Sequence, residues 1–365
     1  MKKIYSFIII AMAALVSAPV FTSCTDDNGQ EQTGEVDTTE LEAALEECQA
    51  LLDDATTTDY PEEAINTFQE TVDTVNEALA AGGLTQTVVN NLLANLNAAR
   101  DTFEASAYGA IPDENLLLSF DFDTEGNTQV STGTLAYEAE LTAGPSEIYG
   151  SDTALPEFVE GINGGHAISL SNGSHLEIAN WNQSELLKSD VSVSVWVNPS
   201  EMVEGNYVFA INYWNTLKIN IPSHGRPCLT INTTEGGADM DNSVPESVKP
   251  DTWTHLVMTV SLTDNVVNMY VNGELTKTFT DADYPAIGGA SFSTYTPAAG
   301  GQLPIMIGTT TTYEEAATWT WTWSQTPEYW NASVAYNGLI DNLKVYDIAL
   351  TDGQVSKLYS DELGE

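Results

Sequence analysis

Hydrophobic residues recur with two different periods along the chain, and the period changes near residue 106. Before this point, apolar side chains return every three or four residues, as on one face of an amphipathic helix. Breaks at Pro61 and at Gly82–Gly83 divide this part into three stretches. The pattern predicts an antiparallel three-helix bundle over residues 38–107. Its expected core residues are Leu41, Leu45, Cys48, Leu52, Ile65, Phe68, Val72, Val75, Leu79, Val89, Leu92, Leu93, Leu96 and Phe103.

From Asn115 onward the apolar and polar residues tend to alternate, which is the period of a half-buried strand. The clearest case is the segment 191–197, where valine alternates with serine. No long helical stretch follows residue 106, so we expect a mainly β fold, an all-β sandwich of two sheets over residues 112–362. The expected strands are 116–122, 166–170, 174–178, 191–197, 253–260, 266–271, 274–277, 303–307 and a closing strand within 336–347.

Two turn signals predict how some of these strands pair. Asn272–Gly273 is typical of a tight hairpin turn between 266–271 and 274–277, and the strand 253–260 is expected to pair with 266–271. Ser171–Asn172–Gly173 similarly predicts a hairpin between 166–170 and 174–178.

The closing strand contains an acidic residue at a position where the pattern predicts an inward side chain. Alternation places Asp341 on the same face as Leu339, Leu343 and Val345. A carboxylate among aliphatic side chains needs a hydrogen-bonding partner or a cation.

The closing run YNGLIDNLKVYDIALT (336–351) resembles the end of laminin G-like domains of the concanavalin A-like lectin/glucanase superfamily. Other segments that resemble this family occur in the expected order: HAISLSNGSHLEI (166–178), VSVSVWV (191–197), WTHLVMTV (253–260) and VNMYVNGEL (267–275). The resemblance implies a jelly-roll sandwich that binds glycans or proteins. Some relatives are glycoside hydrolases, so it also raises the question of catalysis.

The same resemblance implies a structural calcium ion at Asp341. Calcium takes several oxygen ligands, and Asp121 and Asp123 would supply more of them if the first and last strands pair as in the family. The alternative is that backbone amides or a nearby loop satisfy the Asp341 carboxylate.

The first residues predict export and lipidation. Lys2–Lys3 and the apolar run 8–20 are typical of a signal peptide, expected to span residues 1–23. Small residues before Cys24 resemble a bacterial lipobox, which implies that Cys24 is lipidated. The alternative is a soluble secreted protein in which this cysteine has no such role.

An acidic tether, residues 24–37, separates Cys24 from the predicted bundle. Its segment 25–27 resembles the tag that sends some lipoproteins to the outer face of the bacterial outer membrane. The bundle itself, 38–107, resembles FIVAR-type three-helix repeats, which implies a spacer. The expected location is therefore the outer membrane, with the lipid-anchored protein facing the cell exterior.

Charge narrows the range of partners. The chain has 10 Lys and Arg residues against 53 Asp and Glu residues, and a formal net charge of −43. Such a surface repels phosphate backbones and anionic headgroups, so we expect no nucleic acid ligand and membrane contact only through the lipid anchor. An outer-membrane protein remains a possible partner.

No catalytic motif occurs within the predicted sandwich. One string, Glu35 to Glu40, matches the E-x-D-x-x-E pattern of laminarinase-type hydrolases, but it lies in the tether and the start of the first helix. The four histidines have no metal-ligand spacing, and we expect them on sheet surfaces or loops. We therefore expect a protein that is not an enzyme.

Aromatic residues gather before the closing strand. Period two places Trp319, Trp321 and Trp323 on one face of an inserted extended segment, and Tyr329 and Trp330 follow it. Sugar rings stack on such aromatic faces, so these five residues are the candidate glycan platform. The alternative is an insert packed against its own sandwich. Tyr213 and Trp214 are further candidates.

The sequence thus predicts a non-catalytic surface lipoprotein that binds an extracellular polysaccharide or oligosaccharide. The alternatives are an adhesion module for a protein partner and a glycoside hydrolase whose catalytic residues the patterns do not identify.

Overall fold

The computed structural model describes residues 36–57, 59–242, 244–319 and 322–364, without the side chains of Ala105, Thr322 and Trp323. The predicted signal peptide, the candidate lipidation site Cys24, most of the predicted tether and Trp321 lie outside the described residues.

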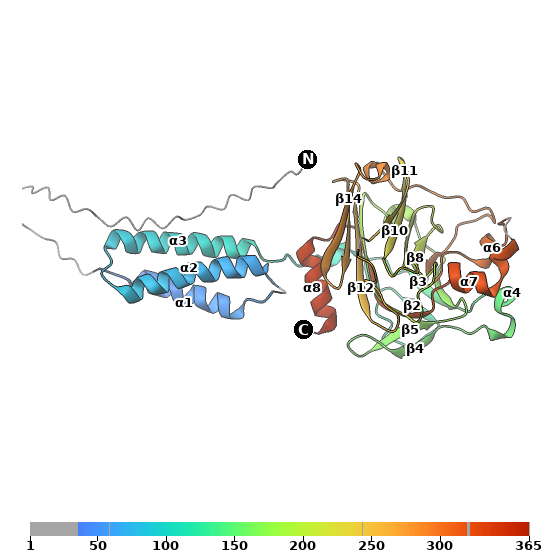
Figure 1. The fold of residues 1–365 in the computed structure, drawn as a ribbon, viewed down its shortest axis with the longest axis horizontal. Coiled ribbons are helices and arrows are strands. Elements are labelled where there is room, and N and C mark those ends of the chain that lie inside the picture. The colour runs from blue at the N-terminus through green and yellow to red at the C-terminus, as the bar shows by residue number, and fades with distance from the viewer. Residues whose placement is uncertain (1–35, 58, 243, 320–321, 365) are drawn as a thin grey trace, which may run out of the picture.

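The N-terminal part is the predicted three-helix bundle (Figure 1), formed by α1 (Thr39–Asp54), α2 (Glu62–Ala81) and α3 (Gln86–Ala105). Its core contains Cys48, Phe68, Val72, Leu96 and Phe103, and the rings of Phe68 and Phe103 stack with centroids 4.7 Å apart. The helical period therefore gave the correct elements and the correct core. None of the helices in the described ranges combines the length and apolar character needed to cross a bilayer.

The C-terminal part is a sandwich of two antiparallel sheets, which confirms the predicted mainly β fold. The sheet nearer the bundle in Figure 1, here the proximal sheet, has the order β14 (Glu274–Thr280), β13 (Val266–Val271), β12 (Thr254–Ser261), β7 (Asp190–Pro199), β16 (Gly338–Tyr346), β5 (His166–Leu170) and β4 (Glu157–Glu160), and β1 (Leu116–Phe120) also pairs with β16.

The sheet farther from the bundle, here the distal sheet, has the order β11 (Gly236–Asp241), β10 (Cys228–Thr233), β9 (Leu217–Asn220), β8 (Tyr207–Ile211), β15 (Ile305–Ile307), β6 (His175–Ile178), β3 (Glu138–Thr142) and β2 (Thr128–Val130).

The main core lies between the sheets, where alternation directs apolar side chains inward. On β7, Val191, Val193, Val195 and Val197 face this core, as the sequence predicted. The predicted pairing of β12 with β13 and the hairpin from β13 into β14 are also present.

The predicted hairpin at 171–173 is wrong. β5 pairs with β4 and β16 in the proximal sheet, whereas β6 pairs with β3 and β15 in the distal sheet. The turn has positive φ at Asn172 (48°) and Gly173 (74°) and carries the chain from one sheet to the other. The apolar residues on both sides, such as Leu170 and Leu176, then enter the shared core from opposite sheets.

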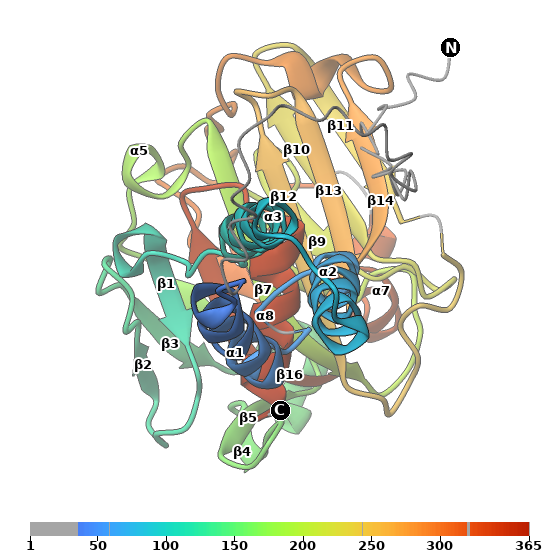
Figure 2. The same ribbon diagram turned by 90° about the vertical axis from the view of Figure 1, so that its left-hand side faces the viewer.

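Short helices cover the two outer faces of the sandwich (Figures 1 and 2). α8 (Asp352–Leu363) packs on the proximal sheet, where Val355 and Leu358 share a cluster with Val257 of β12 and Tyr346 of β16. On the far side of the distal sheet, Figure 1 shows α4 (Ser146–Tyr149), α6 (Tyr313–Ala316) and α7 (Pro327–Ser333) together. The other short elements are η1 (Asp113–Asn115), η2 (Gly150–Asp152), α5 (Gln183–Leu186), η3 (Pro285–Gly288) and η4 (Thr322–Gln325).

α8 also contacts the bundle. The Lys357 ammonium lies 3.6 Å from a carboxylate oxygen of Asp59, in the α1–α2 loop. Gly353 packs so closely against the ring of Tyr108 that an added Cβ would lie 1.8 Å from it. The molecule is therefore layered from the bundle through α8 and the two sheets to the α4–α6–α7 end.

Candidate functional site

Three aromatic side chains meet beside α6, at the end of the molecule opposite the bundle (Figure 1). They are Tyr213, Trp214 and Trp319, which we call the aromatic patch. The ring centroids of Tyr213 and Trp214 lie 4.2 Å apart, and those of Tyr213 and Trp319 lie 5.0 Å apart. Trp214 is 40% exposed and is the one aromatic residue among the exposed large hydrophobic residues of the described ranges. The patch therefore offers a partly exposed indole that packs on a buried tyrosine ring.

The β8–β9 hairpin fixes this geometry. Asn212 and Tyr213 have φ of 56° and 63°, and a bulky residue in that region is strained unless its surroundings hold it there. The Asn212 amide donates to the Thr216 hydroxyl (3.0 Å), and the Asn232 amide donates to the carbonyl of Trp214 (2.6 Å). The strained turn is thus bonded at both ends, and it turns Trp214 outward while Tyr213 stays buried.

A charged pair lies next to the patch on the outer face of the distal sheet. The Lys218 ammonium is 5.1 Å from the ring centroid of Tyr207 and 5.9 Å from that of Trp214. It is 3.9 Å from a carboxylate oxygen of Asp239, which also accepts a hydrogen bond from Thr230. Aromatic faces, a cation and a carboxylate are therefore neighbours here, which is the combination that sugar rings and their hydroxyls require.

The predicted five-residue platform needs correction. Trp330 is fully buried and packs with Ile148, Ala316 and Val334, so its ring is not available for stacking on a ligand. Tyr329 is half-buried against the same cluster. The segment that contains Tyr329 and Trp330 therefore packs on the sandwich through a small hydrophobic core of its own.

The predicted extended segment does not continue through Trp323. Residues 322–325 form the 3₁₀ helix η4, in which side chains do not alternate between two faces. Trp321 and the side chain of Trp323 lie outside the described residues. Trp319 is half-buried and joins Tyr213 and Trp214, so the patch combines one residue of the predicted platform with both of the further candidates.

A second candidate site is an acidic pocket of about 180 Å³ beside β16. The predicted pairing of the first and last strands is present, since β1 pairs antiparallel with β16. This pairing brings Asp121 and Asp123 to the same pocket as Asp341, as the resemblance implied, and α8 adds Glu362. The other lining residues are Ile162, Asn163, Gly164, Gly165 and Asn342.

The predicted inward direction of Asp341 is wrong, because β16 contains a bulge. The register shifts between Asp341 and Lys344, and Asn342 has φ of 45°. A bulge adds one residue to the strand and reverses the side-chain phase beyond it. Ile340 and Leu343 therefore both face the core, and Asp341 lies in the pocket at the outer surface.

Backbone amides hold the Asp341 carboxylate, as the alternative reading of the sequence expected. Ile162 N–H donates to one oxygen (2.9 Å) and Asn342 N–H to the other (2.7 Å). Burial nevertheless raises the pKa of Asp341 to about 7; the two amides lower it, and the charges of Asp123 and Glu362 raise it further. Burial is thus the main reason that this carboxyl group resists ionisation, and the neighbouring negative charges add to the effect.

The donor set suits calcium in kind. Carboxylates from three chain segments and the backbone of the 162–165 loop are hard oxygen ligands. Within the described ranges, however, no three acidic, histidine or cysteine side chains are close enough together to form a ready-made metal site. No aromatic residue is among the nine that line the pocket, so it offers no surface for a sugar ring.

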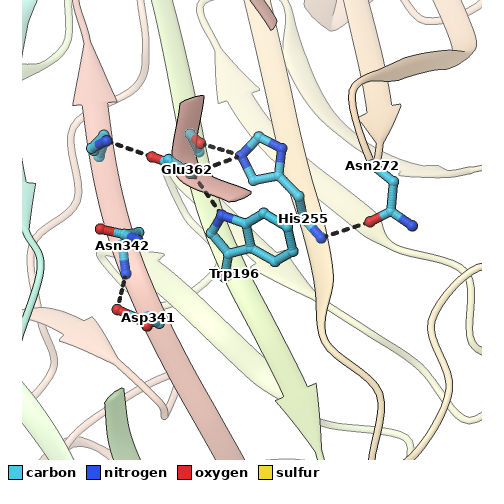
Figure 3. A network of polar contacts seen from close by, with 8 residues as sticks. Trp196, His255, Asn272, Asp341, Asn342 and Glu362 are labelled. Carbon is cyan, nitrogen blue, oxygen red and sulfur yellow. Dashed lines mark hydrogen bonds and ion pairs between the residues drawn. The ribbon is translucent and has the colours of Figure 1, made fainter. Parts of the chain in front are cut away.

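A Ser–His–Glu cluster lies under α8, on the outer face of the proximal sheet (Figure 3). Ser194 is 2.8 Å from Nε2 of His255, and Glu362 is 3.6 Å from the same nitrogen. Nδ1 of His255 has no partner among the described residues. A hydrolase triad needs its acid on the nitrogen opposite the serine, so this cluster lacks the required geometry.

Burial also separates this cluster from any substrate. His255 is fully buried, and burial together with the charge of Lys344 lowers its pKa to about 3. Glu362 accepts a hydrogen bond from the Trp196 indole (2.6 Å) and pairs with Lys344, so it attaches α8 to the sheet (Figure 3). His175 is buried as well, so these two histidines lie on strands of the sheets, but other parts of the chain cover them.

Comparison with solved structures finds matches of low sequence identity. The binding domain of Paraclostridial Mosquitocidal Protein 1 is 15% identical with a TM-score of 0.46, and the match covers 68% of this chain and 52% of that one. Domain 4 of AbnA, a GH43 extracellular arabinanase from Geobacillus stearothermophilus, solved with arabinotriose, is 19% identical with a TM-score of 0.44, and the match covers 68% of this chain and 100% of that one.

A structure of botulinum neurotoxin type C, described by its interaction with two ganglioside molecules, is 14% identical with a TM-score of 0.44. The match covers 68% of this chain and 52% of that one, so the chain spans about half the length of this structure and of the mosquitocidal binding domain.

No curated protein matches the sequence. A family model does match, over residues 170–356, more than half of the chain. Its description is the concanavalin A-like lectin/glucanases superfamily. The matched range extends from the end of β5 into α8 and contains the β8–β9 hairpin, Trp319 and Asp341. This chain therefore belongs to the concanavalin A-like lectin/glucanases superfamily.

Proposed function

We propose that the protein binds an extracellular glycan at the aromatic patch and does not cleave it. The observation that carries this proposal is the strained β8–β9 hairpin, which holds Trp214 exposed against Tyr213, whose ring also packs with Trp319. A sugar ring would stack on the Trp214 indole, and Lys218 and Asp239 are near enough to bond its hydroxyls. Membership of a lectin-type superfamily supports the same class of ligand.

The layered fold supports a role at a surface. The patch lies at the α6 end, the bundle lies at the opposite end, and Cys24 precedes the bundle in the sequence. If Cys24 is lipidated, as its lipobox-like context predicts, the bundle serves as a spacer and the patch faces away from the membrane. We propose that the protein is attached to the outer membrane in this orientation, facing the cell exterior.

We also propose that the acidic pocket binds calcium in a structural role. The carboxylates of Asp123, Asp341 and Glu362 line the same pocket, and this supports the proposal because a cation would reduce the repulsion that Asp123 and Glu362 exert on Asp341. Asp341 and Asp123 would contribute carboxylate oxygens, and the 162–165 loop and water would complete the coordination. The ion would join β1 to β16 and stabilise the sandwich, with no part in chemistry.

A glycan array tests the proposed function. The full chain carrying Cys24→Ala, so that it stays in solution, is applied to the array beside the same protein with Trp214→Ala. We expect a defined group of glycans to bind the first protein and to lose most of their signal with the second. Binding that survives Trp214→Ala would move the site away from the patch. An array without any ligand would favour the competing interpretation, an adhesion module for a protein, and product analysis on any ligand found would expose hydrolysis.

A further inference from the structure

We propose that Lys218 and Asp239 together recognise two adjacent hydroxyls, so that the aromatic patch selects uncharged glycans with a free vicinal diol. This inference rests on the proposed function and adds the class of ligand. Its basis is a lysine whose ammonium has no hydrogen-bond acceptor among the described residues, beside a carboxylate that is largely open to solvent.

Lys218 is unusually buried for a lysine. Its side chain is 8% exposed, and a lysine this buried is ordinarily paired with acceptors. Among the residues that the structure describes, its nearest carboxylate oxygen is that of Asp239, at 3.9 Å, and no protein acceptor lies within hydrogen-bonding distance. The rings of Tyr207 and Trp214 fix the position of the ammonium without using its three N–H donors.

Asp239 supplies the complementary group. It lies on β11, at the edge of the distal sheet, and its side chain is 74% exposed. Oδ1 accepts the Thr230 hydrogen bond, which fixes the carboxylate, while Oδ2 has no partner in the described ranges. The Lys218 ammonium, 3.9 Å from Oδ1, and the second carboxylate oxygen, Oδ2, are therefore a donor and an acceptor held close together.

This donor–acceptor pair matches the chemistry of a vicinal diol. Each hydroxyl can both accept and donate, so one can accept from the Lys218 ammonium while its neighbour donates to Asp239. Both bonds involve a charged protein group and are therefore stronger than bonds between neutral groups. With the sugar ring stacked on the Trp214 indole, Lys218 and Asp239 would determine which edge of the sugar faces the distal sheet.

Charge argues against an acidic sugar. A ligand carboxylate would compete with Asp239 for Lys218, and Asp241, 44% exposed, lies on the same edge strand. At longer range the protein as a whole repels an anionic polymer, because the chain has 53 acidic and 10 basic residues. Placing like charges at the rim of a site is a common way to reject the wrong ligand.

Affinity gel electrophoresis of the Cys24→Ala full chain tests the inference. The neutral probes with vicinal diols are xyloglucan and mannan, and laminarin, whose 1,3-linked residues lack a vicinal diol except at chain ends, is the neutral control. The acidic probes are polygalacturonate, alginate and chondroitin sulfate. We expect xyloglucan or mannan to retard the protein, and laminarin and the acidic probes to retard it less at low salt. We expect periodate, which cleaves the carbon–carbon bond of a vicinal diol, to abolish retardation by the neutral probe that binds.

Substitutions then separate the contributions of Lys218 and Asp239. Lys218→Met keeps the apolar stem, and we expect affinity for the neutral probe to fall roughly ten-fold or more, because a bond from a charged donor is lost. Asp239→Asn should weaken neutral binding and raise the relative retardation by polygalacturonate. The matched control is Lys277→Met, since Lys277 also lies over an aromatic ring, Phe279 at 4.9 Å, but on β14 of the proximal sheet. This control should bind like the parent protein.

The outcomes distinguish this inference from the function on which it rests. If acidic probes bind best, or if the Lys218 and Asp239 variants bind like the parent, the diol inference is wrong while glycan binding stands. If no glycan on the array or in the gels binds the parent protein, the proposed function itself fails and this inference with it. Should Lys218→Met prove unfolded in a melting experiment, Asp239→Asn and the periodate comparison still decide the question.

Discussion

Truncating Trp330 should destabilise the sandwich strongly, whereas truncating Trp214 should not. Trp330 is fully buried among Ile148, Ala316 and Val334, so Trp330→Ala leaves a cavity that these neighbours fill only in part. Such truncations cost about 3–5 kcal/mol. For a domain of this size each 1 kcal/mol lowers the Tm by about 2–4 °C, so we expect a decrease on the order of 10 °C.

The indole nitrogen of Trp330 allows a sharper version of this test. Nε1 is buried and has no hydrogen-bond partner among the described residues. A buried donor left unpaired costs about 1–3 kcal/mol, so Trp330→Phe removes an unfavourable group along with some favourable packing. The two effects have opposite signs and similar size. We therefore expect the phenylalanine variant to melt within a few degrees of the parent protein, far above the alanine variant.

Trp214→Ala is the surface comparison. Because Trp214 is 40% exposed, its removal should change the free energy of unfolding by about 0.5–1 kcal/mol at most. Its effect should appear in glycan affinity, at roughly 1–3 kcal/mol by analogy with base–aromatic stacking. Calorimetry and binding on the same three variants are the assays. A Trp330→Ala protein that melts like the parent, or a Trp214→Ala protein that melts as low as Trp330→Ala, would refute the assignment of one ring to packing and the other to binding.

Three further predictions concern the pocket, the domains and the anchor. The pKa of Asp341 is raised from 3.8 to about 7, so the folded protein holds this proton more tightly than the unfolded chain, and stability without calcium should fall as the pH rises from about 4 to about 7. Calorimetry should show this fall in the parent protein relative to Asp341→Asn, and calcium at pH 7.5 should raise the Tm of the parent alone; equal responses would remove Asp341 from the site. A fragment of residues 107–365, which keeps Tyr108 against α8, should melt cooperatively by itself, and an unfolded fragment would show that the sandwich needs the bundle. Cys24→Ala should release the protein from the membrane fraction, whereas continued sedimentation with membranes would contradict lipid anchoring.

The bundle and the central strands were predictable because their periods are clean. In β7 the valines face the core while Ser192, Ser194 and Trp196 face outward, so hydropathy alone indicates the strand. The strands that the sequence analysis missed include β8 and β9, which are buried on both faces. In β9 the polar residues Lys218 and Asn220 are buried as well. The alternation of polar and apolar residues is therefore a weaker signal for strands such as β8 and β9.

The acidic pocket shows that a set of site residues can be predicted correctly although the predicted conformation of one of them is wrong. The family resemblance placed Asp121, Asp123 and Asp341 together, and strand pairing brings them to one pocket. The predicted direction of Asp341 failed because a single bulged residue, Asn342, reverses the phase of β16, and period-two reasoning assumes an uninterrupted strand.

The tryptophan-rich insert shows the opposite case. Its alternating letters suggested an extended stripe, yet residues 322–325 form a 3₁₀ turn and Trp330 enters a small core. Composition correctly marked the region as unusual but did not reveal which rings are exposed. The sequence analysis named Tyr213 and Trp214 as further candidates, and the signal that would have favoured them is the preceding Asn212, a turn residue that tolerates positive φ.

The position of β16 has a consequence for biogenesis. This strand is the last in the sequence, yet it lies inside the proximal sheet, with β7 on one side and β1 and β5 on the other. Until residue 346 has emerged, β1 has no strand partner, and β5 and β7 each lack one neighbour. Contacts this distant in sequence form slowly and leave partial sheets with open edges. The proximal sheet therefore cannot be completed during synthesis until β16 has emerged.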